Sequence, residues 1–450
     1  MCLGSDANRN CGARNPRRRG GRPDLNLRRS AGMLASAALA AYHPLPCADS
    51  GCRPCGPART HHTAAPARTD PMNQHTPAAA LACAGLLGYC RAGFEKELAA
   101  ELDDIAAEAG LIGYVRAEPD SGYVIYETFE PTPLGSFGES TDWRRPVFAR
   151  QLLPWFARVD DLPERDRAAP IVEAVKASGQ RISGVMLETP DTDEAKQRSG
   201  FCKRFTEPLA KALEKAGCLR SSRAGLPVLH VLFTSATTAW LAAGQPGQCS
   251  TWPMGIPRLR MPSNAPSRST AKLSEAFMML LEEGERDSIL RAGQRAVDLG
   301  AAPGGWTWQL VNRGLRVTAI DNGPLRDSVM ATEMVEHLKA DGFTWRPHRP
   351  VDWMVCDMVE QPSRIASLMA EWVATGRCRY TIFNLKLPMK KRHEELARCD
   401  TLMRSRFDRA GVRARLAFRH LYHDREEVTG FVEVAARGTG RPRRRTSGAA

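Results

Sequence analysis

The sequence lacks any apolar run approaching the roughly 20 residues that a membrane-spanning helix needs. It also lacks the Gly-x-Gly-x-x-Gly spacing of dinucleotide-binding loops. Beyond residue 71 the cysteines stand singly among apolar neighbours, as reduced cytosolic thiols usually do. We therefore expect neither a membrane protein nor a nicotinamide-dependent oxidoreductase, but a cytoplasmic protein without a bound metal.

The middle of the chain also lacks a strong net charge. The 450 residues carry a formal net charge of +13, of which residues 1–71 contribute +7 and residues 437–450 contribute +5. Residues 72–436 therefore carry a net charge of only +1. Nucleic-acid binding must be argued from local basic patches rather than from the overall charge.

The two ends of the chain have no sustained hydrophobic period. Residues 1–81 are interpreted as a disordered or mis-annotated extension, with Met72 as an alternative start, and residues 437–450 as a basic disordered tail. Arg28-Arg29 loosely resembles a twin-arginine export signal. Cys52 and Cys55, followed by two histidines, could bind zinc, but such short motifs are weak evidence.

Residues 82–243 predict an α+β region in two units. The first has strands at 86–90, 111–116 and 122–128 with a helix at 94–102, an order that suggests a ferredoxin-like sandwich. The second has helices at 168–178 and 199–216 and strands at 182–188, 226–233 and 237–243. Lys203, Arg204 and Lys211 gather on one helix, which indicates either RNA contact or a solvated helix face.

Residues 271–436 predict a doubly wound, Rossmann-like α/β domain, because strands and helices alternate there. A segment rich in Pro and Ser, residues 244–270, precedes the domain and is typical of a linker or a long ordered loop. We expect strands at 295–299, 315–320, 352–356, 380–385, 413–419 and 428–435, and helices at 271–282, 306–313, 363–374 and 389–409.

The segment from Asp298 to Leu310 predicts the end of a strand, a glycine turn and the start of a helix. Its spacing, Asp-x-Gly-x-x-Pro-Gly-Gly, resembles the first motif of S-adenosylmethionine (SAM) methyltransferases. Glycines let the backbone turn tightly and approach a ligand. Asp321 closes the next strand, where an acid can accept both ribose hydroxyls, although either Asp could instead be an ordinary turn residue. Asp341 is a candidate near the adenine or an Asp-Gly turn.

Four charged residues could supply the chemistry of methyl transfer to a hydroxyl. Lys272 precedes the first strand of the domain, Asp357 and Lys386 end two strands, and Glu427 starts a late strand. A lysine can remove a hydroxyl proton only as a neutral amine, and charged neighbours can orient it. Glu426 competes with Glu427 for the fourth position.

This Lys-Asp-Lys-Glu order resembles the tetrad of the RrmJ/fibrillarin-like 2′-O-methyltransferases. Several segments are more closely similar to the RlmM family, which methylates a cytidine ribose in bacterial 23S rRNA: Ala265–Thr270, Ala296–Gly300, Trp353–Met358, Ile382–Arg392, Leu421–Val428, Cys90–Glu95 and Pro190–Thr192. The resemblance covers about residues 82–436.

The resemblance implies a THUMP-like RNA-binding region before a SAM-dependent methyltransferase domain, with Lys386 as the proton acceptor. From the motif and the resemblance together we expect cofactor contacts at Ser269, Asp298, Gly300, Ala302, Pro303, Gly304, Gly305, Trp306, Asp321, Asp341 and Asp357. Local basic residues complete the expected RNA path: Lys203, Arg204, Lys211, Arg258, Arg260, Lys390, Lys391 and Arg392.

Other activities fit the sequence less well. A base N-methyltransferase would need an Asn/Asp-Pro-Pro-aromatic turn where the chain has Asp357–Glu360. A cytosine C5-methyltransferase would need a nucleophilic Cys, and Cys356 is more typical of a buried structural thiol. A SAM-binding rRNA assembly factor without catalysis is the remaining alternative. We expect a monomer that binds 23S rRNA or a large-subunit precursor, and the sequence leaves open which of these two is the substrate.

Overall fold

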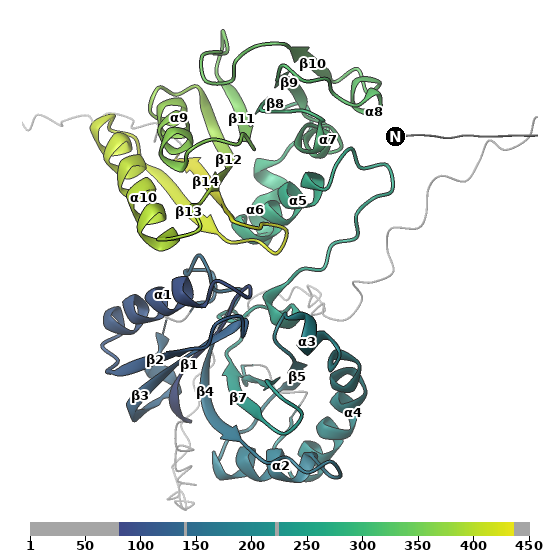
Figure 1. Ribbon diagram of the computed structural model, residues 1–450, viewed down its shortest axis with the longest axis vertical. Helices are drawn as coiled ribbons and strands as arrows, with labels where there is room; N and C mark the ends of the chain where they lie inside the picture. Colours follow the sequence, from purple (N-terminus) through teal and green to yellow (C-terminus); the bar gives the residue numbers. More distant parts are fainter. Residues whose placement is uncertain (1–80, 139–141, 221–224, 436–450) are drawn as a thin grey trace, which may run out of the picture. The chain divides into compact units, whose positions relative to one another are not determined.

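The structure is a computed structural model that describes residues 81–138, 142–220 and 225–435, all within one compact unit of the chain. The interpretations of residues 1–80 and of the basic tail, including the export signal and the zinc ligands, lie outside the described residues. Two mixed seven-stranded sheets organise the rest (Figure 1).

The first sheet belongs to an N-terminal lobe and has the strand order β2-β3-β1-β4-β7-β6-β5. Its strands are β1 (Ala82–Tyr89), β2 (Gly113–Ala117), β3 (Tyr123–Pro133), β4 (Gln151–Val159), β5 (Gly184–Glu188), β6 (Val228–Phe233) and β7 (Ala239–Gly244). Its helices are α1 (Glu95–Glu108), η1 (Leu134–Ser136), α2 (Ala168–Ala177), α3 (Asp193–Lys196) and α4 (Ser199–Lys215).

Strand β4, absent from the sequence prediction, joins the two expected units into one sheet. It pairs antiparallel with β1 on one side and with β7 on the other. Part of the expected linker also belongs to this lobe, because a short 3-10 helix, η3 (Pro253–Gly255), buries Met254 beside Leu87 and Trp155. Burial of these apolar side chains explains why the segment is ordered there.

The second sheet forms the C-terminal lobe, with the order β10-β9-β8-β11-β12-β14-β13. Its strands are β8 (Arg295–Leu299), β9 (Arg316–Ile320), β10 (Val335–Leu338), β11 (Val351–Cys356), β12 (Cys378–Lys386), β13 (Ala414–Arg419) and β14 (Glu427–Val434). Its helices are α5 (Ser269–Leu280), α6 (Glu283–Ile289), α7 (Gly305–Val311), α8 (Asp327–Met330), α9 (Pro362–Ala374) and α10 (Arg392–Arg409).

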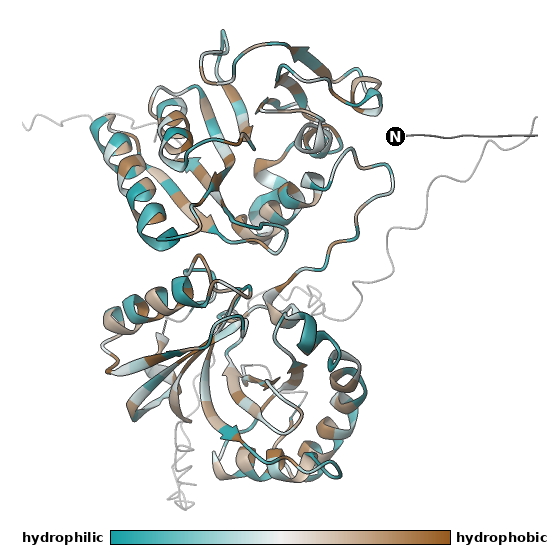
Figure 2. Cartoon of the chain, in the orientation of Figure 1, coloured by the Kyte–Doolittle hydropathy of each residue, from teal (hydrophilic) through white to brown (hydrophobic). Residues whose placement is uncertain are grey.

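The C-terminal sheet is covered on both faces, as the doubly wound prediction requires. Met354 and Cys356 pack in one apolar cluster with α9 and α10, whereas Trp353 and Val355 pack in another with α5 and α7. This alternation along β11 follows from the two-residue period of a strand. Hydrophobic residues follow the strands, and hydrophilic ones line the outer side of α10 (Figure 2).

Strand direction decides where the polar ends of this sheet meet. Strands β10, β9, β8, β11 and β12 are parallel, and β14 runs antiparallel between β12 and β13. The end of β12 therefore lies beside the beginning of β14, where Lys386 is the register partner of Glu427. Two residues expected in separate strands are thus direct neighbours.

Candidate active site

A glycine turn connects β8 to α7 as the sequence predicts. Gly300 has φ 79° and Gly304 has φ 107°, values that favour glycine. A Cβ on Gly300 would lie 2.5 Å from Met358 Cγ, and one on Gly305 would lie 2.5 Å from Ser269 Oγ. The turn is therefore packed between the segment after β11 and the start of α5, with no room for side chains.

Asp321 ties the end of β9 to this turn. Its carboxylate accepts a hydrogen bond from the Ala302 amide at 2.9 Å and another from the Gly323 amide at 2.7 Å. The side chain is thereby oriented at the edge where the carboxyl ends of β8 and β9 meet. Pro303 is exposed and Ala302 is half-buried, so this part of the turn faces outward.

Two expected cofactor contacts prove to be internal supports of the turn. Asp298 is 1% exposed and accepts a hydrogen bond from Thr307 Oγ1 at 2.6 Å. Burial raises the pKa of the Asp298 carboxyl to about 7. Trp306 is 2% exposed, and its indole donates to the Ser269 carbonyl at 3.0 Å. Both side chains support the turn from inside, and their contact with a cofactor stays a prediction.

Asp341 lies in an Asp-Gly turn, which is one of the two alternatives that the sequence analysis gave for it. Its Oδ1 accepts a hydrogen bond from the Phe343 amide at 2.9 Å, and the side chain is exposed beyond the end of β10. Such an Asx turn explains the Asp-Gly pair without a ligand. Ser269 lies at the first position of α5, with its hydroxyl 2.8 Å from that of Ser267.

The four charged residues meet at the carboxyl end of the C-terminal sheet. Lys386 Nζ lies 2.9 Å from Asp357 Oδ1 and 3.7 Å from Glu427 Oε1. Lys272, on α5, donates a hydrogen bond to the same Glu427 oxygen. Lys386 therefore stands between two carboxylates and shares one of them with a second lysine.

Burial and charge act in opposite directions on this set. Burial opposes the positive charge of Lys272, but Asp357 and the hydrogen bond to Glu427 outweigh it and raise the pKa of the ammonium group. Burial likewise opposes the charge of Glu427, but the hydrogen bond from Lys272 outweighs it and lowers the pKa of the carboxyl. The Lys272–Glu427 pair is therefore ionised, and it presents a fixed pair of charges to Lys386.

The choice between the two adjacent glutamates is decided by strand direction. Glu427 opens β14 beside Lys386, and its side chain is 9% exposed. Glu426 is 51% exposed and pairs with Arg392 at 2.5 Å. Glu427, rather than Glu426, therefore lies with the other three charged residues, and its role in catalysis stays a prediction.

Most of the expected RNA-binding residues lie on the surface, with one exception. Lys203, Arg204, Arg258, Arg260 and Lys390 are exposed. Lys211 is also exposed but pairs with Glu207 at 2.7 Å, and Lys391 pairs with Glu394 at 3.2 Å.

Arg392 differs from the other residues of this set, and its contact with RNA stays a prediction. It is 11% exposed, pairs with Glu97 and Glu426, and lies over the Phe94 ring. A guanidinium with these partners is held in the fold and is not free for a phosphate.

The buried polar residues around the tetrad were not predicted. Asn384, Thr429 and Asp424 are all fully buried and hydrogen-bonded in a chain that reaches Asp357. Cys356 is buried too, and burial raises the pKa of its thiol to about 12, in keeping with a structural role. A polar residue in an otherwise apolar strand is the signal that could have pointed to Asn384.

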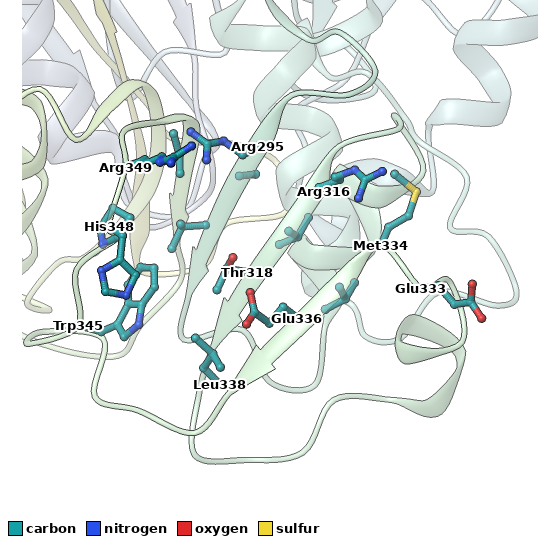
Figure 3. A pocket seen from close by; sticks show the side chains of 16 residues that line it. Arg295, Arg316, Thr318, Glu333, Met334, Glu336, Leu338, Trp345, His348 and Arg349 are labelled. Atoms are coloured by element: carbon teal, nitrogen blue, oxygen red, sulfur yellow. The ribbon is translucent and has the colours of Figure 1, made fainter.

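A cavity of about 660 Å³ opens at the other end of the same sheet (Figure 3). It is lined near the beginnings of β8 and β9 by Arg295 and Arg316, and by Trp345, His348 and Arg349 from the segment before β11. None of the residues predicted for catalysis or cofactor binding lines it.

Comparison with known proteins identifies the family. A model of the RlmM ferredoxin-like domain matches residues 83–153, one of the N-terminal part of ribosomal RNA large subunit methyltransferase M matches residues 166–244, and one of FtsJ-like methyltransferases matches residues 265–397. Ribosomal RNA large subunit methyltransferase M of Thauera aminoaromatica is 93% identical over 363 residues, which are 81% of this chain and 100% of that protein. This chain belongs to that family.

More distant proteins agree with the family. The large subunit methyltransferase M of Methylococcus capsulatus is 49% identical over 351 residues, which are 78% of this chain and 98% of that protein. The solved structure of fibrillarin from Aeropyrum pernix with bound SAM is 14% identical to this chain, with a TM-score of 0.27, and the match covers 45% of this chain and 81% of fibrillarin. The expected α/β methyltransferase domain and ferredoxin-like domain are confirmed, whereas the THUMP-like character expected for residues 82–243 stays a prediction. No described helix is long and apolar enough to span a membrane.

Proposed function

We propose that this chain transfers a methyl group from SAM to the 2′-hydroxyl of a cytidine ribose in 23S rRNA. The observation that carries the proposal is the contact of Lys386 Nζ with Asp357 at 2.9 Å and with Glu427 at 3.7 Å. Two carboxylates orient this amine at the carboxyl edge of a doubly wound sheet, beside the cofactor turn, where it can accept a proton when it is neutral.

The turn around Gly300 fits SAM. Close packing leaves no space for a side chain at Gly300 or Gly305. Asp321 is oriented to accept the two ribose hydroxyls of a nucleoside. When bound, SAM supplies a sulfonium-linked methyl group as the electrophile. Met358 and Ser269 border the turn and would lie beside SAM if it binds there.

The tetrad moves one proton. Lys386, as a neutral amine, accepts the proton of the 2′-hydroxyl while the ribose oxygen bonds to the methyl carbon and the carbon–sulfur bond breaks. The products are the methylated ribose, neutral S-adenosylhomocysteine and an ammonium group on Lys386. Asp357 and Glu427 stabilise that ammonium, and Lys272 balances the charge of Glu427.

Exposed basic residues bring the RNA to this edge. Lys390 and Lys391 follow β12 just beyond Lys386, and Arg258 and Arg260 precede α5. Phosphate contacts would set the affinity and its salt dependence, whereas the tetrad and the turn would set the reacting atom. The rRNA substrate also implies a cytoplasmic enzyme, and a monomer suffices for this set of residues.

The test is methyl transfer from labelled SAM to 23S rRNA that lacks its modifications, with the label mapped to the nucleotide and to ribose or base. We expect ribose label with the wild type and a loss of at least about a hundredfold in kcat for Lys386→Ala, with SAM binding retained. Lys176→Ala, an exposed lysine on α2 that pairs with Glu173, is the control and should label normally.

Label on the base, or full activity of Lys386→Ala, would refute the tetrad mechanism. SAM binding without label from the wild type on either free rRNA or a large-subunit precursor would instead indicate an assembly factor.

A further inference from the structure

A line of buried hydrogen bonds leads from the tetrad into the core of the C-terminal lobe. Asn384 Nδ2 donates to Asp357 Oδ1 at 2.7 Å. The Thr429 hydroxyl lies 2.8 Å from Asn384 Oδ1 and 3.0 Å from Asp424 Oδ2. Asn384, Thr429 and Asp424 are each 0% exposed, so water does not compete for these contacts.

The register of β12 and β14 places this line beside the tetrad. Asn384 is the register partner of Thr429, and two residues further along, Lys386 is the register partner of Glu427. Because side chains two apart on a strand share a face, both pairs lie on the same face of the sheet. The buried pair is therefore the inward neighbour of the catalytic pair.

The number of protons on each side chain decides which group donates in these hydrogen bonds. Asp357 accepts from both Lys386 and Asn384, so the amide nitrogen of Asn384 must face Asp357 and its oxygen must face Thr429. Thr429 has a single hydroxyl proton, and it is the one donor facing the oxygen of Asn384 in this line. The 3.0 Å contact between Thr429 and Asp424 then needs its proton from Asp424.

The surroundings of Asp424 act on its carboxyl in both directions. Burial, the largest effect, raises the pKa of this carboxyl well above its ordinary value, and Glu427 and Glu275 raise it further, whereas Lys272 and the hydrogen bond from the Leu421 amide lower it. The Leu421 amide donates to Asp424 Oδ2 at 3.0 Å, and Arg91 donates to the Asp424 backbone carbonyl.

We propose that Asp424, Thr429 and Asn384 are positioning residues that form a directed relay, which fixes the Asp357 carboxylate and through it Lys386. This inference rests on the function proposed above. Each group donates to the next, from Asp424 through Thr429 and Asn384 to Asp357. The relay leaves Asp357 Oδ1 shared between a neutral amide donor and Lys386.

The sharing bears directly on catalysis. A carboxylate that serves Lys386 alone would hold the proton on that lysine more firmly, whereas a second donor on the same oxygen weakens its hold. The charged groups facing Lys386 are Asp357 from the end of β11, Glu427 from β14 and, through Glu427, Lys272 from α5. Loss of the relay should therefore shift the rise of the pH–rate profile to higher pH.

The test uses the full chain, with labelled SAM and unmodified 23S rRNA as probes. Thr429→Val removes the relay proton with little change in shape. We expect kcat to fall about tenfold at neutral pH with KM for SAM changed less than about twofold, and the profile to shift to higher pH. Thr429→Ser, which restores the hydroxyl, should recover most of the rate.

Thr381→Val on β12 is the matched control. Thr381 is equally buried, but its hydroxyl contacts only the sulfur atoms of Met354 and Met369 among the described residues, at 3.5 and 3.6 Å. It should keep the wild-type profile. Asn384→Ala is the second route if Thr429→Val does not fold, and it should show the same shift to higher pH.

Three outcomes would overturn the relay. Thr429→Val could match Thr381→Val, it could lose rate by the same factor at every pH, or serine could fail to restore it. If any of these occurs while Lys386→Ala is inactive, the relay alone is wrong. If Lys386→Ala is fully active, the proposed base is wrong and the relay falls with it.

Discussion

The two ends of the C-terminal sheet carry polar residues in different states. At the carboxyl end, Asp298, Asp357, Lys386 and Glu427 are partly or fully buried and each is held by another polar side chain. At the opposite end, Arg316 and Arg349 line an open cavity and are exposed (Figure 3). Both ends are rich in charge, but at the carboxyl end the charged side chains contact one another, whereas at the opposite end Arg295 donates to the Pro350 carbonyl. Mutual contact between charged side chains, rather than charge or cavity size, distinguishes the end of the sheet at which we propose the reaction.

Substitution of the two adjacent glutamates, one at a time, should give the largest difference in kcat. Glu427→Gln removes the charge that faces both Lys272 and Lys386, and we expect kcat to fall about a hundredfold. Glu426→Gln changes an exposed residue and should retain activity within about twofold. Steady-state methyl transfer by the two variants measures the contrast, and equal losses would show that the tetrad is misassigned.

Two glycines, one at each end of β8, separate backbone strain from crowding. Gly300→Ala would bring a Cβ to 2.5 Å from Met358 Cγ, whereas a Cβ at Gly293 meets nothing within 4 Å. Both have positive φ, 79° and 85°, so their backbone cost is similar. We expect Gly300→Ala to weaken SAM binding about tenfold or more, and Gly293→Ala to leave it unchanged. Calorimetric titration with SAM measures this, and equal affinities would place the cofactor elsewhere.

Exposed basic residues at the two ends of the C-terminal sheet should differ in how much they contribute to RNA binding. Lys390→Ala, just beyond the tetrad strand, should weaken binding of 23S rRNA about threefold and reduce its salt dependence. Arg349→Ala, at the cavity of Figure 3, should change neither. Filter binding over a range of salt concentrations measures both slopes. A larger effect of Arg349→Ala would mean that the RNA path crosses the opposite end of the sheet.

The smallest expected effect is on stability. The pKa of Asp298 rises from 3.8 to about 7 on folding, so the folded chain binds more protons than the unfolded chain between these values. Stability from this group is therefore greatest at low pH, falls as the pH rises through that window and is constant above it. Asp298→Asn should remove this slope, by about 1 kcal/mol or more across the window. Urea unfolding at the two ends of the window measures it, and an unchanged slope would contradict burial as the cause.

The sequence analysis succeeded for residues whose amino-acid type is unusual at their position in the expected fold. Lys386 stood out because a lysine rarely ends an apolar strand, and Gly300 and Gly304 because their spacing marks a turn. All three residues lie where the sequence analysis expected them, and so do most of the strands from β8 to β14.

The features that the sequence analysis did not predict depend on contacts with residues far away along the chain. Thr429 looks like an ordinary strand residue until register sets it against Asn384. Strand β4 contains Pro154, which is uncommon in a central strand, and β10 has only four residues. Arg392 looked like a free cation because its partner Glu97 is nearly 300 residues earlier.

The position of β14 has a consequence for when the enzyme becomes active. This strand is the last element of the described chain, yet it inserts between β12 and β13, which are made before it. It brings Glu427 to Lys386 and Thr429 to Asn384. A nascent chain that ends before residue 427 already contains the whole cofactor turn but lacks both partners. Catalysis by the proposed tetrad would therefore require β14 to be in place between β12 and β13.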